Sequence, residues 1–343
     1  MGIFENKYYQ EDLNRIAEFL PNKKMSILIT GATGLIGSCL IDALLYANYK
    51  FDRSYTLYAT GRSEDKLKNR FSYAVDNGSL HFIVQDIRDA ISDNIELDYI
   101  VNAASNADPR SYALYPVETI ETNVVGTINA LEYAKRHKGT KVILTSTMEV
   151  YGIVSGKDSY SENDYGIIDF NQVRAGYPES KRVAELLCRS YAEEYNVQAV
   201  IARLGYIYGP TMSETDNKVV AQFIRNIIKH EDIVLKSEGI QKRSYCYVAD
   251  VVSGIFVALF KGAASEVYNI ASQNSIITIK DMAEVAAEIS GSKVIFELPS
   301  EVETKGSSEA QDVVLGIEKL QSLGWNPLYT IRAGLERTVK ILE

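Results

Sequence analysis

Gly31-Ala32-Thr33-Gly34-Leu35-Ile36-Gly37 follows directly on the apolar run Met25-Ser26-Ile27-Leu28-Ile29-Thr30. Glycines at this spacing, between a buried strand and a helix, are typical of a turn that holds the pyrophosphate of a dinucleotide. We expect Gly31 to allow the tight turn, Gly34 to leave room for the phosphates, and Gly37 to let the helix pack closely on the sheet. The helix N-terminus would supply unpaired N–H donors and a positive potential. A purely structural glycine turn is the alternative.

Short apolar runs rich in β-formers alternate with helical stretches before Gly205, and this alternation predicts an α/β fold with a Rossmann-type, doubly wound parallel sheet. The further candidate strands are Tyr55–Ala59, His81–Val84, Tyr99–Val101, Lys141–Thr145 and Gln198–Ala202. After Gly205 we expect an amphipathic stretch Val219–Lys229, a segment Lys242–Phe260, and helices near Lys280–Ser290 and Ile331–Leu342. The predicted domains are a dinucleotide-binding domain, residues 1–204 plus about 246–272, and a smaller interleaved substrate-binding cap, residues 205–245 plus 273–343.

The composition excludes several function classes. The chain has 343 residues, 46% of them hydrophobic, and a net charge of −9. An acidic protein is a poor partner for nucleic acid or an anionic membrane surface, so neither is expected. No apolar run is long enough to span a bilayer. Cys39, Cys188 and Cys246 lie far apart without metal-ligand spacing, which favours buried thiols, no metal site and a cytoplasmic location.

Two segments outside the motifs carry expectations of their own. Residues Glu11 to Leu20 predict an amphipathic helix with Leu13, Ile16, Ala17 and Leu20 on one face, docked on the body or on a neighbouring subunit. The N-terminal 24 residues carry charges and no apolar core, so we do not expect them to form a secretory peptide. The tract Leu298–Asp312 predicts an exposed loop at the edge of the site.

Tyr177-Pro178-Glu179-Ser180-Lys181 places a tyrosine and a lysine on one face of a helix. An exposed tyrosine has a pKa of about 10, and lowering it by roughly three units needs about 4 kcal/mol of preferential phenolate stabilisation. The Lys181 ammonium one turn away, with the positive ring of an oxidised nicotinamide, is predicted to supply it. Pro178 suits a first helical turn and puts Tyr177 at the helix entrance, facing a cleft. A solvated Tyr/Lys pair is the alternative.

Thr145-Ser146-Thr147-Met148-Glu149-Val150-Tyr151-Gly152 ends a predicted parallel strand, where side chains face the ligand crevice. From Ser26 to Leu342 the chain resembles the extended short-chain dehydrogenase/reductases, the family of nucleotide-sugar epimerases, dehydratases and decarboxylases. The resemblance implies that Thr147 binds the reacting sugar hydroxyl, Tyr177 is the acid/base, and Lys181 binds the ribose. Thr145 and Ser146 are open to a simpler role as caps of the next turn.

Further segments extend the resemblance. Gln85-Asp86-Ile87-Arg88-Asp89 is similar to the adenine-binding strand end, Val101-Asn102-Ala103-Ala104 to the segment lining the cofactor phosphates, and Thr122-Asn123-Val124-Val125-Gly126-Thr127 to a helix whose Asn is architectural. Arg174-Ala175-Gly176-Tyr177 and Gln241–Asp250 look most like UDP-glucuronate decarboxylases. There Arg243 aligns with an arginine that contacts the substrate's diphosphate or sugar, and a surface salt bridge is the alternative. The implied cofactor residues are Gly31, Thr33, Gly34, Leu35, Ile36, Gly37, Arg62, Ser63, Asp86, Ile87, Asn102, Ala103, Ala104, Thr145, Tyr177 and Lys181, and the implied substrate residues are Ser105, Thr147, Met148, Tyr206 and Arg243.

Several departures limit the reaction that the resemblance implies. Met148 stands where 4,6-dehydratases have an acidic residue, and a thioether cannot donate a proton. Glu149 matches a glutamate of dehydratases and decarboxylases, and it is either a group acting near sugar C5 or a carboxylate paired with a nearby cation. Gly205 stands where the family commonly has an Asn, and the usual Arg is missing near Glu309-Ala310-Gln311-Asp312.

The second strand ends in Gly61-Arg62-Ser63 without the carboxylate that binds the ribose of NAD, so the sequence favours NADP over NAD. A plain solvated turn is the alternative for Arg62. We expect an NAD(P)-dependent nucleotide-sugar enzyme of the epimerase/decarboxylase type, acting by transient oxidation at sugar C4, and, by the resemblance, a homodimer. The alternatives are an NADPH-dependent reductase of a keto-sugar or small carbonyl compound, and a non-catalytic NAD(P)-binding regulatory protein.

Overall fold

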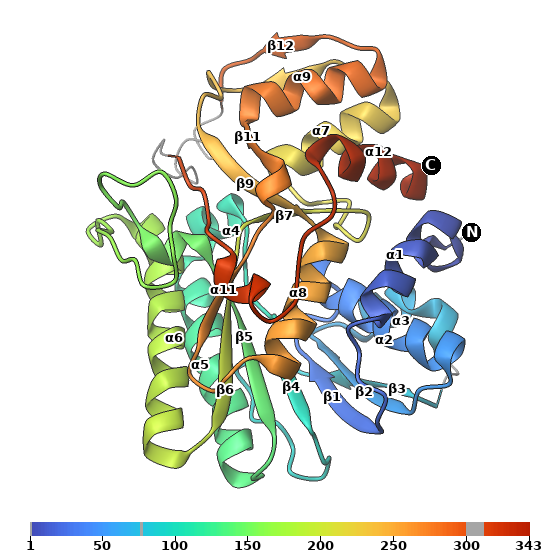
Figure 1. Cartoon of the computed structure of the whole chain (residues 1–343), viewed down its shortest axis with the longest axis vertical. Helices are drawn as coiled ribbons and strands as arrows, with labels where there is room; N and C mark the ends of the chain where they lie inside the picture. Colours follow the sequence, from blue (N-terminus) through green and yellow to red (C-terminus); the bar gives the residue numbers. More distant parts are fainter. Residues whose placement is uncertain (1, 76–77, 300–311) are drawn as a thin grey trace.

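A seven-stranded sheet forms the centre of the computed structural model of this chain, which describes residues 2–75, 78–299 and 312–343 (Figure 1). The strand order is β10-β6-β5-β4-β1-β2-β3, and all neighbouring strands are parallel. This is the doubly wound α/β sheet that the alternation predicts. The strands are β1 (Met25–Ile29), β2 (Tyr55–Gly61), β3 (Leu80–Val84), β4 (Tyr99–Asn102), β5 (Lys141–Thr147), β6 (Gln198–Leu204) and β10 (Val267–Ile270).

Helices cover both faces of this sheet. On one face α5 (Pro116–Arg136) and α6 (Gly176–Tyr195) bury an apolar cluster that includes Leu131 and Cys188. On the other face α2 (Leu35–Phe51) and α8 (Val248–Lys261) bury the larger cluster, and α1 (Lys7–Ala17) packs against both of them. The remaining helices of this lobe are α3 (Glu64–Arg70), α4 (Pro109–Leu114) and α11 (Glu318–Gln321). Burial on both faces explains why the strands read as continuous apolar runs.

A smaller lobe stands above the carboxyl ends of the large sheet (Figure 1). It contains a three-stranded sheet, β11-β9-β7, and a two-stranded sheet, β12-β8. Between β9 and β11 the chain returns to the large lobe to form α8 and β10. The elements of the upper lobe are β7 (Tyr206–Tyr208), α7 (Val219–Lys229), β8 (Ile233–Leu235), β9 (Lys242–Tyr247), β11 (Ile276–Thr278), α9 (Ile279–Ser290), β12 (Val294–Phe296) and α12 (Ile331–Leu342).

The N-terminal amphipathic helix is present, but its predicted bounds are wrong. Helix α1 spans Lys7–Ala17 rather than Glu11 to Leu20, because the Asn6 side chain caps it by accepting a hydrogen bond of 2.9 Å from the Tyr8 N–H. Leu13 and Ile16 are fully buried, so the helix docks on the body of its own chain.

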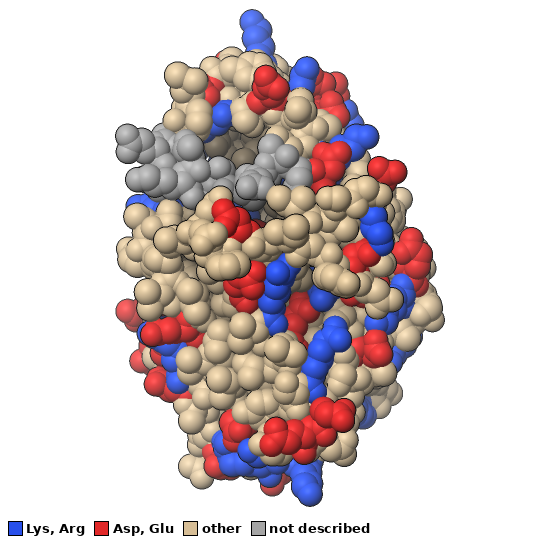
Figure 2. Space-filling view, turned by 90° about the vertical axis from the view of Figure 1, so that its left-hand side faces the viewer, with Lys and Arg blue, Asp and Glu red and all other residues tan. Residues whose placement is uncertain are grey.

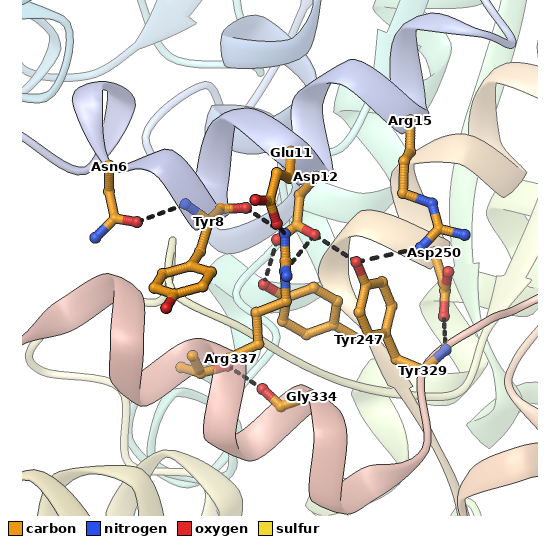
Figure 3. A network of polar contacts seen from close by, with 11 residues as sticks. Asn6, Tyr8, Glu11, Asp12, Arg15, Tyr247, Asp250, Tyr329, Gly334 and Arg337 are labelled. Carbon is orange, nitrogen blue, oxygen red and sulfur yellow. Dashed lines mark hydrogen bonds and ion pairs between the residues drawn. The ribbon is translucent and has the colours of Figure 1, made fainter.

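A buried carboxylate ties α1 to the upper lobe (Figure 3). Asp12 is fully buried and accepts hydrogen bonds from the hydroxyls of Tyr247 (2.7 Å) and Tyr329 (2.6 Å) and from Nε of Arg337 (2.6 Å). Arg337 lies on α12, and its guanidinium also pairs with Glu11 at 3.0 Å. The first and last helices of the chain are therefore joined through charged hydrogen bonds.

The structure bears on three smaller expectations. Cys39, Cys188 and Cys246 are buried free thiols. Within the described ranges, the helices are too short or too polar for a membrane span. Residues 300–311 of the tract Leu298–Asp312, and with them most of the stretch Glu309-Ala310-Gln311-Asp312, lie outside the described residues.

Candidate active site

The glycine-rich turn has the geometry that a dinucleotide site requires. Gly31 has φ +65°, and a Cβ there would lie 2.9 Å from the carbonyl oxygen of Ala103. A Cβ on Gly37 would clash with the carbonyl oxygen of Gly31, so α2 needs a glycine to pack this closely. Gly34 is the N-cap of α2, and a Cβ there would lie 3.3 Å from the carbonyl oxygen of Gly31. The Gly34 position provides no side chain to cap the helix. The N–H groups of the first turn of α2 are thus left for a ligand.

The rest of the predicted cofactor segment lies at the carboxyl ends of β1, β4 and β5. The hydroxyl of Thr30 accepts hydrogen bonds of 3.0 Å from the N–H groups of both Ala103 and Ala104. Asn102 donates to the Thr127 hydroxyl at 3.2 Å, and the Thr145 hydroxyl donates to the Asn102 carbonyl at 3.1 Å. These bonds fix the wall of the crevice beside the glycine turn. Thr33 lies in that turn, and Leu35 and Ile36 begin α2.

At the end of β2 the predicted cofactor residues already have protein partners. Arg62 forms an ion pair of 2.5 Å with Glu118 of α5, although its side chain is 62% exposed. The Ser63 hydroxyl caps α3 by accepting a hydrogen bond of 3.3 Å from the Lys66 N–H. The Glu118 carboxylate beside Arg62 works against a bound 2′-phosphate, because like charges repel. Arg62 is therefore already paired with a carboxylate, which weakens the sequence argument for NADP.

The adenine-binding segment follows β3. The Asp86 carboxylate pairs with Arg88 at 3.0 Å, and the hydrogen bonds from Arg88 hold the pKa of Asp86 below its ordinary value. Ile87 is buried against α5, where a Cβ on Gly126 would lie 2.7 Å from its side chain. Asp86 and Ile87 thus lie beside the end of β2, at the predicted adenine end of the crevice.

Tyr177 and Lys181 lie in the first two turns of α6, as their spacing predicts, and Pro178 occupies the first turn. Lys181 is 2% exposed, and its ammonium donates to the carbonyl oxygen of Thr145 at 2.8 Å. Burial lowers the pKa of Lys181 to about 8. The lysine is therefore anchored to the end of β5, next to the wall formed by β4.

The expectation that Tyr177 faces an open cleft is wrong. Its side chain is only 6% exposed and is covered by the ring of Tyr112 rather than open to a cleft. Burial, and then the negative charge of Glu149, raise the pKa of Tyr177 above its ordinary value. Hydrogen bonds with Thr147 and Tyr112 and the charge of Arg174 act in the opposite direction. The Lys181 ammonium donates to a backbone carbonyl, and the lowering of the Tyr177 pKa by Lys181 together with an oxidised nicotinamide stays a prediction.

Thr147 ends β5 and lies within hydrogen-bonding reach of Tyr177. Its hydroxyl also accepts a hydrogen bond of 3.3 Å from the Glu149 N–H and caps a short 3-10 helix, Met148–Tyr151. Glu149 forms an ion pair of 2.6 Å with Arg174, which is the cation pairing considered for it above. Met148 is buried. Ser146 donates to Glu185 at 2.5 Å, which gives it a structural role.

The predicted substrate residues fall into two places. Ser105 lies near the cofactor wall, and its hydroxyl donates to Asn123 at 2.8 Å, while Asn123 donates to Ser180 of α6 at 2.9 Å. Arg243 of β9 and Tyr206 of β7 meet in the upper lobe, where the guanidinium carbon lies 4.4 Å from the ring centroid. The buried Nε of Arg243 has no hydrogen-bond partner among the residues that the structure describes.

The departure at Gly205 has a steric reason. A Cβ at this position would lie 2.7 Å from the carbonyl oxygen of Ser244. The chain passes here from β6 to β7, directly against β9. No side chain fits between the two segments, so any polar contact to a ligand has to come from other residues.

Two residues of the site were missed in the sequence. Tyr112 of α4 covers Tyr177, and the guanidinium carbon of Arg174 lies 4.5 Å from the centroid of the Tyr112 ring. Arg174 stands three residues before Tyr177, so its position near the site could have been inferred. No pattern in the sequence singles out Tyr112, because α4 is a six-residue helix in an irregular connection.

Comparison with known proteins identifies the family of this chain. Residues 27–271 match the NAD dependent epimerase/dehydratase family. The chain is 34% identical to UDP-glucuronic acid decarboxylase 5 of Arabidopsis thaliana over 91% of this chain and 87% of that protein. It is 32% identical to UDP-glucuronic acid decarboxylase 1 of Xenopus tropicalis, over 94% of this chain and 73% of that protein.

Solved structures give the same fold. UDP-glucuronic acid 4-epimerase from Bacillus cereus, in complex with UDP-glucuronic acid and NAD, is 25% identical, with a TM-score of 0.75 over 93% of this chain and 99% of that chain. DesIV, a dTDP-glucose 4,6-dehydratase from Streptomyces venezuelae with NAD and TYD bound, is 25% identical, with a TM-score of 0.78 over 92% of this chain and 96% of that chain. The chain therefore belongs to the NAD-dependent epimerase/dehydratase family.

Proposed function

We propose that this protein uses NAD to convert UDP-glucuronic acid, by oxidation at C4 and loss of the C5 carboxyl group, into a UDP-pentose. One observation carries the proposal. A chain 34% identical to a UDP-glucuronic acid decarboxylase brings Thr147, Tyr177 and Lys181 together at the end of β5, beside a glycine turn shaped for a dinucleotide. Because the exact reaction depends on few residues, it needs a direct product assay.

The cofactor would lie along the wall of the crevice. The turn from Gly31 to Gly37 and the N-terminus of α2 would hold the pyrophosphate, Asp86 and Ile87 the adenine end, and Lys181 the ribose. NAD, when bound, supplies a hydride acceptor for sugar C4 and returns the hydride at the end, so that it is not consumed. We propose NAD rather than NADP, because Glu118 holds Arg62 in an ion pair at the end of β2.

Tyr177 would take the proton of the C4 hydroxyl, while Thr147 holds that hydroxyl in place. This step requires the pKa of Tyr177 to fall below its value in the ligand-free protein, and a bound cation beside the phenol favours the phenolate. Once C4 is a ketone, the carboxylate on C5 is β to it and leaves as carbon dioxide, and the electron pair passes into the enolate. A proton then returns to C5, which balances the reaction. Glu149 and Arg174, which form an ion pair, are two residues whose charges act on the pKa of Tyr177.

The test is to incubate the purified protein with NAD and UDP-glucuronic acid, and with UDP-glucose as a second substrate, and to measure product masses. Loss of carbon dioxide from UDP-glucuronic acid is expected. An unchanged mass with a new retention time would replace decarboxylation by 4-epimerisation, the reaction for which the Bacillus cereus neighbour is named. A gain of two hydrogens with consumption of NADPH would establish the reductase alternative. Equal activity in Tyr177→Phe would overturn the role of Tyr177.

We also propose a homodimer formed by α5 and α6. Val117 and Ile120 on α5 and Val183 and Leu186 on α6 are apolar and exposed, and each pair is spaced so that both side chains share a face of their helix. Figure 2 looks at this side of the molecule and shows a broad uncharged area edged by charged side chains. Leu186→Glu should reduce the mass measured by light scattering to that of one chain, and an unchanged mass would contradict this interface.

The buried free thiols support a cytoplasmic location.

A further inference from the structure

Tyr112 contacts two groups of the proposed reaction centre. Its ring stacks on Tyr177, with ring centroids 4.5 Å apart and planes inclined by 24°. The guanidinium carbon of Arg174 lies 4.5 Å from the centroid of the same ring, and Arg174 pairs with Glu149 at 2.6 Å. Tyr112 is 5% exposed, so little of its ring meets the solvent. The stack with Tyr112 therefore shields the Tyr177 ring from the solvent.

The hydroxyl of Tyr112 also lies close to the acid/base. The side chains of Thr147 and Tyr112 both act on the Tyr177 phenol and lower its pKa, against the larger effect of burial. A sugar hydroxyl that gives its proton to Tyr177 has to lie within hydrogen-bonding distance of the same phenol oxygen, next to Thr147. A phenol oxygen offers one donor and few acceptor directions, so the Tyr112 hydroxyl competes with the sugar for this place.

Tyr112 is carried by an element that can move without disturbing the large sheet. Helix α4 has six residues, and the side chain of Asp108 caps it by accepting a hydrogen bond of 3.0 Å from the Ser111 N–H. Asp108 also accepts a hydrogen bond of 3.1 Å from the amide of Asn217, which precedes α7 in the upper lobe. This contact links the position of α4 to the upper lobe. A short helix whose link to the upper lobe is an exposed hydrogen bond opens at lower cost in free energy than the elements of the core.

We propose that the Tyr112 side chain fills the sugar subsite, and that the substrate has to displace it from Tyr177 and Arg174. The proposal rests on the proposed role of Tyr177 as the acid/base. Displacement also uncovers Arg174. Its buried Nε has no hydrogen-bond partner among the described residues, so it is left as a donor for the acidic substituent on sugar C5. Displacement of Tyr112 thereby admits the sugar to the site and exposes Arg174 to the substrate in the same step.

The sign of one mutational effect separates a displaced residue from a substrate contact. If Tyr112 has to leave, Tyr112→Ala removes a competing stack and a competing hydrogen bond, so the KM for UDP-glucuronic acid falls by about tenfold. If Tyr112 binds the substrate, the same variant raises KM. Tyr112→Phe keeps the ring and loses only the hydroxyl, so its KM falls less. Tyr115→Ala removes an exposed tyrosine at the start of α5 and is the matched control, with an unchanged KM.

A second measurement requires no activity. N-acetylimidazole acetylates accessible phenols, and peptide mass spectrometry reports the rate at Tyr177 in the full chain without added ligand. Tyr177 is expected to react about tenfold faster in Tyr112→Ala than in the wild type and at the wild-type rate in Tyr115→Ala. Tyr112→Leu keeps apolar volume without the stack or the hydroxyl, and it carries the same expectation if the alanine variant does not fold.

These results keep the two proposals distinguishable. A raised KM in Tyr112→Ala, or an unchanged acetylation rate at Tyr177, would overturn the displacement of Tyr112. A faster acetylation in a protein that turns over neither UDP-glucuronic acid nor UDP-glucose would support the covering role and would contradict the proposed function alone.

Discussion

Lys181→Met is expected to abolish activity and to stabilise the fold. The lysine is 2% exposed, and its ammonium has the Thr145 carbonyl as a hydrogen-bond partner at 2.8 Å. Burial lowers the pKa of Lys181 to about 8, from 10.5 for an ordinary lysine. That difference corresponds to about 3 kcal/mol of unfavourable burial of the charged form at neutral pH. Removing the charge recovers this free energy, less about 1 kcal/mol for the hydrogen bond to Thr145. The net expected gain is about 2 kcal/mol.

The direction in which the free energy of unfolding changes with pH follows from proton binding by Lys181. Between pH 8 and 10.5 the unfolded chain keeps the proton of Lys181 and the folded chain does not, so the free energy of unfolding rises with pH because of this group. The advantage of Lys181→Met should therefore be largest at pH 7 and shrink as the pH approaches 10. Urea unfolding of both proteins at several pH values measures it, with the exposed Lys138→Met as control. A variant that is less stable than the wild type at pH 7, or a difference independent of pH, would refute the reasoning.

Three further predictions concern the cofactor turn and the frame around it. Glu118→Gln frees Arg62 and should raise the affinity for NADP relative to NAD by up to about fivefold, measured by fluorescence titration, since exposed ion pairs are worth at most about 1 kcal/mol; an unchanged ratio would contradict the role given to Glu118. Asp12→Asn removes a fully buried carboxylate that accepts hydrogen bonds from three donors, so it should lower the free energy of unfolding in urea by about 3 kcal/mol. The control Glu11→Gln loses a largely exposed carboxylate and should change this free energy by less than about 1 kcal/mol. Gly37→Ala places a methyl group against the Gly31 carbonyl and should weaken NAD binding by at least about tenfold in calorimetry, while Gly78→Ala, which meets open space, should leave it unchanged.

The large sheet could be predicted well from the sequence. Parallel strands covered on both faces read as short apolar runs, so every predicted strand from Met25 to Ala202 has a counterpart in the structure. Their ends were less accurate: β5 and β6 run on to Thr147 and Leu204, because parallel pairing continues through the polar residues Ser146 and Arg203. Helix α1 begins earlier than its apolar face suggests, because Asn6 supplies a cap.

The candidate site was predictable only where a local pattern encodes it. The glycine turn and the Tyr177/Lys181 pair are local, and the structure places the turn after β1 and the Lys181 ammonium at the end of β5 of the same sheet. The cover of Tyr177 by Tyr112 and the ion pair of Arg62 with Glu118 join residues from separate elements, so spacing along the chain carries no signal for them. The burial that raises the pKa of Tyr177 comes from the same long-range packing, so no local pattern in the sequence indicates it.

The most direct test of the central claim is rapid mixing of the NAD-loaded protein with UDP-glucuronic acid, with the absorbance of reduced nicotinamide as the signal. The wild type should show a transient of reduced cofactor that is followed by release of carbon dioxide. Tyr177→Phe should bind the nucleotide sugar with similar affinity and form reduced cofactor about a thousandfold more slowly. A transient of wild-type rate in Tyr177→Phe would show that the phenol does not take the C4 proton, and the account would be wrong.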